Sequence, residues 1–100
     1  MQTYIDRVIE AVKTETHIKS DRLAQIYALL VLIKGETISL KDVHDAWAVD
    51  MNSRPRTDHC YGHDHKSIVP FSALPDETKQ KDQRFVTALK RVAANLKNIN

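Results

Sequence analysis

The stretch SDRLAQIYALLVLIKG, residues 20–35, decides the fold that this sequence predicts. Ser20 is a typical helix N-cap, and Asp21 suits the positive end of a helix dipole. The pair Lys34–Gly35 ends the helix, because glycine readily adopts the left-handed conformation of a C-cap. Between these ends, apolar side chains cover most of the circumference. Such a helix is usually packed on more than one side, so the sequence predicts a central helix here.

A helix is predicted on each side of this central one. Thr3 with Asp6, and Ser39 with Asp42, form capping-box-like starts. The first helix carries an apolar stripe over residues 4–12, and the other runs to about Met51 and carries the only tryptophan. The linker between the second and third helices is about four residues long, so these helices should be neighbours.

The last part of the chain predicts a fourth helix. It begins at Leu74–Pro75, with proline in its first turn, and continues along an apolar stripe to Ile99. Before it, residues of about 52–67 show no periodicity and predict a long loop. The run Ile68–Phe71 is a candidate for a short β segment. The predicted fold is therefore mainly α, a compact four-helix single domain over residues 1–100.

Composition limits the function classes. The chain has 100 residues, of which 42% are hydrophobic, and its formal net charge of +2 is too small to argue for nucleic-acid or membrane binding. Its single cysteine, Cys60, excludes an intrachain disulfide. The amino terminus lacks a signal-peptide pattern, and no apolar run approaches the roughly 20 residues that span a bilayer. We therefore expect a cytoplasmic protein.

Histidine and cysteine gather in the predicted loop, as His59, Cys60, His63 and His65. Zinc could use such residues, but they lie closer together than the ligand pairs of a typical structural site. Cys60 could also serve as a nucleophile beside a histidine base, although nothing in the sequence brings the two together. The simplest interpretation is a polar loop. We expect neither a metal site nor a cofactor nor catalysis.

The same region predicts a ligand pocket. Its cationic side chains outweigh Asp58 and Asp64, and three of the six aromatic residues lie in or beside it. Guanidinium groups hold phosphate or carboxylate oxygens at two points, and aromatic faces stack on planar rings. Together they indicate a site for an anionic molecule with a flat group, such as a nucleotide. Trp47 and Phe71 could equally be plain core residues. The candidate ligand-binding residues are Trp47, Arg54, Arg56, Tyr61, His63, His65, Lys66 and Phe71.

Several motifs resemble the ryanodine receptor repeat (RyR) domain. They are Val43-His44-Asp45-Ala46-Trp47-Ala48, Tyr61-Gly62, His65 with Ile68-Val69-Pro70-Phe71, Leu74-Pro75, and Lys79 to Asp82-Gln83. Phe71 replaces the tyrosine of the family pattern, and Lys81 replaces an aromatic residue. Small uncharacterised proteins of actinobacteria and their phages are also similar. The resemblance implies a helical module, and bacterial modules of this kind occur beside nucleotide-signalling and defence components.

We therefore expect a non-enzymatic module that binds a small nucleotide-like anion. A free-standing domain of this kind would sequester the ligand, as a phage protein that counters host defence would. The alternative is a protein-interaction or regulatory module, whose aromatic and basic surface docks on another protein or on a second copy of the chain.

Overall fold

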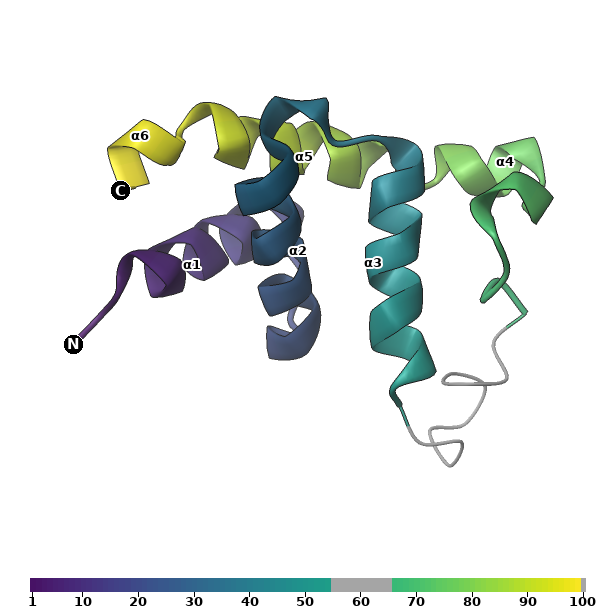
Figure 1. Ribbon diagram of the computed structural model, residues 1–100, viewed down its shortest axis with the longest axis horizontal. Helices are drawn as coiled ribbons and strands as arrows, with labels where there is room; N and C mark the ends of the chain where they lie inside the picture. Colours follow the sequence, from purple (N-terminus) through teal and green to yellow (C-terminus); the bar gives the residue numbers. More distant parts are fainter. Residues whose placement is uncertain (55–65, 100) are drawn as a thin grey trace.

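The computed structural model describes residues 1–54 and 66–99. Its longest helices are α1 (Tyr4–Thr16), α2 (Asp21–Lys34), α3 (Leu40–Asn52) and α5 (Gln83–Ala94). Figure 1 shows α2 and α3 side by side, with α5 running across them and α1 beneath α5. The prediction of a mainly helical domain built on four principal helices is confirmed.

The predicted starts of the first three helices are confirmed in detail. The Thr3 hydroxyl accepts a hydrogen bond from the Asp6 N–H, and the Asp6 carboxylate accepts one from the Thr3 N–H. Ser39 and Asp42 form the same reciprocal pair at α3, while Ser20 caps α2. At the end of α2, Gly35 has a φ of +56°, a conformation that L side chains rarely adopt.

The core lies where α1, α2, α3 and α5 meet. The amphipathic stripe of α5 packs against α1 and α2, and α3 packs on the other side of α2. Because α2 is apolar nearly all round, it can contact neighbours on several sides, as the sequence predicts. The fully buried members of this core include Val8, Val12, Ala24, Val31, Val43 and Leu89.

The single last helix predicted from Pro75 to Ile99 is wrong, because the structure divides this segment into α4 (Asp76–Gln80), α5 and α6 (Leu96–Ile99). The first break falls at Lys81–Asp82, where Asp82 has φ −87° and ψ 0° and becomes the N-cap of α5. The second falls at Asn95, whose side chain donates to the Arg91 carbonyl. Aspartate and asparagine are weak helix formers because their side chains offer the backbone local alternatives.

The candidate β segment at 68–71 is also wrong. None of the described residues forms a strand, and Phe71–Ala73 is a 3₁₀ turn, η2, in which the Ala73 N–H donates to the Pro70 carbonyl at 2.8 Å. Proline has no N–H to offer a neighbouring strand, and the neighbour here is a helix. The predicted loop of about 52–67 begins as α3 ends at Asn52, and its central part lies outside the described residues.

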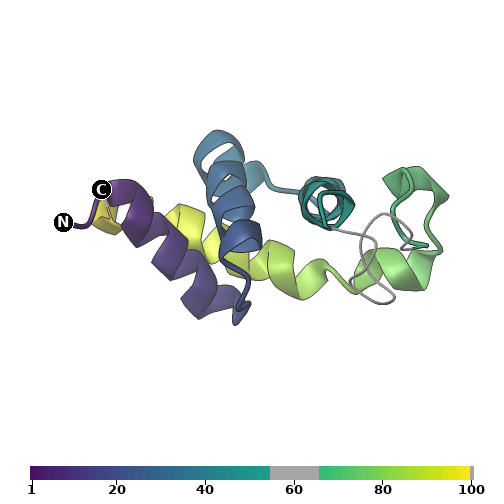
Figure 2. The ribbon, with the colours of Figure 1, turned by 90° about the horizontal axis from the view of Figure 1, so that it is seen from below.

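Different helices form the two ends of the molecule. The start of α1 and the short α6 lie at one end, whereas α4 and η2 lie at the other, beyond α3 (Figures 1 and 2). Seen from below in Figure 2, α3 stands between α2 and the α4 region. The α4 region therefore contacts the rest of the chain mainly through α3 and through its continuation into α5.

Candidate functional site

A buried histidine attaches the segment that precedes α4 to α3. His44 is only 3% exposed, and its Nε2 lies 2.7 Å from the carbonyl oxygen of Val69. Because a carbonyl only accepts, Nε2 carries the proton and donates. This contact joins residues 25 positions apart in the sequence. It brings the middle of α3, which carries His44 and Trp47, against the approach to α4.

Aromatic rings surround this histidine. The centroid of the His44 ring lies 5.8 Å from that of Trp47 and 6.1 Å from that of Phe71. On its other side, the Phe71 ring receives the Lys79 ammonium at 5.2 Å, a cation–π contact from α4. Phe71 therefore links α4 to α3, and Trp47 forms an aromatic wall beside the link.

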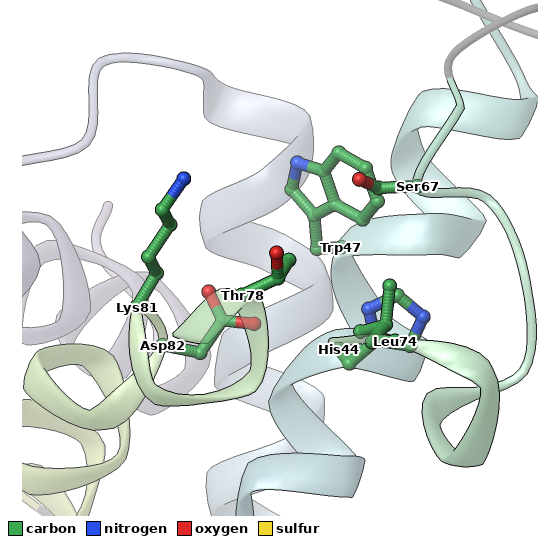
Figure 3. A pocket seen from close by; sticks show the side chains of 7 residues that line it. All are labelled: His44, Trp47, Ser67, Leu74, Thr78, Lys81 and Asp82. Atoms are coloured by element: carbon green, nitrogen blue, oxygen red, sulfur yellow. The ribbon is translucent and has the colours of Figure 1, made fainter. Parts of the chain in front are cut away.

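A cavity of about 210 Å³ opens between α3 and α4 (Figure 3). His44 and Trp47 form its α3 side, and Figure 3 shows Thr78 and Asp82 facing them from α4 and the turn that follows it. Among the described residues, the lining consists of His44, Trp47, Ser67, Leu74, Thr78, Lys81 and Asp82.

The cavity adjoins a larger groove of about 580 Å³. The two spaces share Ser67, Leu74, Thr78 and Lys81, and the groove adds Lys66 and Glu77. Two lysines therefore border the groove. Of the aromatic side chains that the structure describes, His44 and Trp47 line the smaller cavity and not the groove. A ligand that spans both spaces would place an apolar ring in one and a charged group in the other.

The ionised form of the Asp82 carboxyl is destabilised in this cavity. Burial raises the pKa of its carboxyl above the usual value, and the nearby His44 and Arg84 lower it by less. The carboxylate makes no hydrogen bond or ion pair with residues in 1–54 or 66–99. Every other aspartate in those ranges makes one. Asp82 is thus a partly desolvated acceptor that faces a cavity.

Replacing Asp82 with asparagine should change how stability depends on pH. A carboxyl with a raised pKa in the folded state contributes stability at low pH, and this contribution is lost as the pH rises past the ordinary value of 3.8. Wild-type stability should therefore fall with pH in this range through Asp82, and Asp82→Asn should remove that decline. Urea unfolding between pH 3 and 7 measures it. Asp76→Asn, an exposed aspartate on α4, is the control and should keep the wild-type slope.

The structure separates the predicted ligand-binding residues into groups. Trp47 lines the cavity and Lys66 borders the groove, while Phe71 packs behind the cavity against His44. Arg54 forms an ion pair with Asp50 instead, with its Nη2 2.8 Å from Oδ2 of the carboxylate. The other predicted residues, Arg56, Tyr61, His63 and His65, lie outside the described residues.

The pairing of Arg54 has a clear cause. Asp50 is only 1% exposed, and a buried carboxylate is costly unless a cation or hydrogen-bond donor compensates it. Arg54 supplies that partner one helical turn further on, and Arg22 of α2 approaches the other carboxylate oxygen at 3.9 Å. Arg54 therefore compensates Asp50 within the end of α3, and Arg22 connects the same carboxylate to α2.

Sequence reasoning missed His44, Thr78, Lys81 and Asp82 as cavity residues. The sequence holds one indication for each wall of the cavity, in the spacing of its residues. His44 lies three positions before Trp47, so the two share a helix face, and Thr78, Lys81 and Asp82 share a face by the same i, i+3, i+4 rule. Only the fold shows that these two faces meet.

No group of three or more histidine, cysteine or acidic residues that could hold a metal occurs within the described ranges. The histidine and cysteine cluster at 59–65 lies outside them. Within the part of the chain that the structure describes, no helix is both long and apolar enough to cross a bilayer.

The fold and the site define a small helical domain with an aromatic cavity between its third helix and the short helix that follows. The chain belongs to the family described as a domain of unknown function, DUF7701, whose model matches residues 1–94. Neither the curated proteins nor the solved structures gave a match.

Proposed function

We propose that this DUF7701 domain binds a small anionic ligand with a flat ring, of the nucleotide kind, and carries out no chemistry on it. The observation that carries the proposal is the continuity of an aromatic cavity with a groove bordered by lysines. Trp47 offers an indole face for stacking, and Lys66 and Lys81 offer cationic groups for phosphate. Small-ligand sites commonly combine an apolar pocket with a few polar groups in this way.

The dimensions support a division of the ligand between the two spaces. The cavity, about 210 Å³, is smaller than the roughly 300–1,000 Å³ typical of pockets that enclose a drug-sized ligand. It suits a ring rather than a whole nucleotide. The phosphate would then extend into the adjoining groove, where water still reaches the lysines.

The resemblance to the RyR domain supports the same site. His44 and Trp47 come from the Val43–Ala48 motif, and Asp82 comes from the Lys79–Gln83 motif. These residues line one cavity. We propose that the motifs mark a ligand site. On the same basis, we propose that the protein acts in the bacterial cytoplasm by sequestering a nucleotide signal, as a phage protein against host defence would.

Thermal unfolding against a panel of nucleotides tests the proposal. A ligand at about 100 times its Kd adds about 2.7 kcal/mol of stability, which should raise the Tm by roughly 10 °C or more for a domain of this size. Nucleoside 5′-monophosphates and cyclic dinucleotides are the probes, with inorganic phosphate as the ring-free comparison.

Trp47→Ala should abolish the nucleotide response, because it removes the stacking wall. Tyr4→Ala is the matched control: it truncates an exposed aromatic on α1, outside the cavity lining, and should leave the response unchanged. If no probe shifts the wild-type Tm and calorimetry detects no binding, the ligand proposal is wrong.

A second candidate function rests on a different surface. Leu29, Ile33 and Val49 are 58%, 69% and 59% exposed, and a groove of about 240 Å³ runs between them on α2 and α3. Ile26, Leu30 and Ile33 of this surface recur at the spacing by which helices pack together. The partner that fits is the same apolar surface of α2 and α3 on a second copy of the chain, because a two-fold interface pairs a patch with itself. Light scattering on the same samples would then give twice the chain mass of 11.4 kDa.

A further inference from the structure

Three polar residues of the cavity lining come from one stretch of chain. Thr78 lies in α4, and Lys81 and Asp82 follow it in the turn before α5, at spacings of three and four. Trp47 and His44 stand across the cavity on α3 (Figure 3). A flat ring that stacks on the indole in so small a cavity would also meet the polar groups of this stretch, Asp82 among them.

An ionised carboxylate can only accept hydrogen bonds, and it has two oxygens side by side. Asp82 has neither a hydrogen-bond donor nor an ion-pair partner among residues 1–54 and 66–99, although it is half-buried. The most favourable partner for such a group is a pair of adjacent N–H donors that meets both oxygens at once. Thr78, within the same lining, has a hydroxyl that can either donate or accept.

The nucleobases differ in the hydrogen-bond donors and acceptors that their pairing edges present. The pairing edge of guanine carries a ring N–H next to an amino group, which are two adjacent donors. Adenine and cytosine each place an unprotonated ring nitrogen next to the amino group, and uracil flanks its ring N–H with two carbonyl oxygens. An acceptor facing the Asp82 carboxylate would be repelled and left unpaired, which gives discrimination as well as affinity.

Resting on the proposed function, we infer that the cavity selects a guanine-type ring, with Asp82 accepting from its two adjacent N–H donors and Trp47 stacking on its face. In this arrangement Lys81, which borders both spaces, lies where the phosphate leaves the cavity for the groove. The chemical class is a purine with a 2-amino-6-oxo edge that carries a phosphate.

Calorimetric titration with GMP, IMP, AMP and UMP tests this inference on the wild-type chain. GMP should bind about 10- to 100-fold more tightly than AMP or UMP, the discrimination expected of one good bidentate pair. IMP, which keeps the ring N–H and lacks the amino group, should fall between them. This ranking needs no variant, so it does not depend on a substitution that could disturb folding.

Asp82→Asn should lower the affinity for GMP by a similar factor and should not lower the affinity for AMP, because the amide can donate to the adenine ring nitrogen that the carboxylate repels. Asp76→Asn should preserve the wild-type ranking. Equal binding of all four nucleotides, or an unchanged GMP preference in Asp82→Asn, overturns the guanine inference and leaves the proposed function standing. Absence of binding by every nucleotide overturns both.

Discussion

Replacing Leu89 with alanine is expected to lower the free energy of unfolding by about 3 kcal/mol, the middle of the range for a buried leucine. Leu89 lies in α5 and is completely buried in the core with Val12 and Val31. Truncation removes its transfer free energy and leaves a cavity among helices that can only partly close it. Urea unfolding at pH 7 should show a lower midpoint with an unchanged slope.

Leu29→Ala provides the matched control, since it makes the same change at an exposed position of α2. Its effect should stay within about 0.5 kcal/mol, because little burial is lost and alanine favours a helix. Equal effects at the two positions would contradict the arrangement in which α5 faces the core and Leu29 faces outward.

The second large effect concerns His44. His44→Ala is expected to cost about 2 kcal/mol, because it removes a buried ring and its hydrogen bond to the Val69 carbonyl. It should also free the approach to α4, so limited proteolysis within residues 66–75 should become faster while the rest of the chain stays protected. Nucleotide binding should be lost with it, since His44 forms part of the cavity lining.

His44→Phe separates the two contributions of this side chain. Phenylalanine keeps a ring between Trp47 and Phe71 and gives up the hydrogen bond, so it should retain more stability than alanine does. Proteolysis of the His44→Ala variant at the wild-type rate would show that His44 does not hold this segment.

The helices were predictable where their signals are local. Thr3 with Asp6 and Ser39 with Asp42 act across three residues, so their capping geometry can be read directly from the sequence. The apolar stripe from Phe85 onward likewise predicts α5. The break at Asn95 was missed because the stripe continues through it. The break at Asp82 was missed because no glycine or proline marks it, and the opposing preference of one polar residue is weak.

The site was predictable only in part. Trp47 and Lys66 were chosen for their chemistry and do border the two connected spaces. Arg54 was chosen for the same reason, but the sequence gave no sign that Asp50 would be buried beside it. The contact between His44 and Val69 spans 25 positions, and it decides which faces of α3 and α4 meet. Such long-range pairing follows from packing, which residue patterns do not encode locally.

The placement of α4 and η2 beyond α3, away from the junction of α1, α2 and α5, has an evolutionary consequence. Under the proposed function, substitutions at Thr78 or Lys81 would alter what the domain recognises without changing the buried residues of the core. Descendants of such a chain can therefore diverge in specificity while sharing one scaffold, so two members with alike cores need not bind alike molecules.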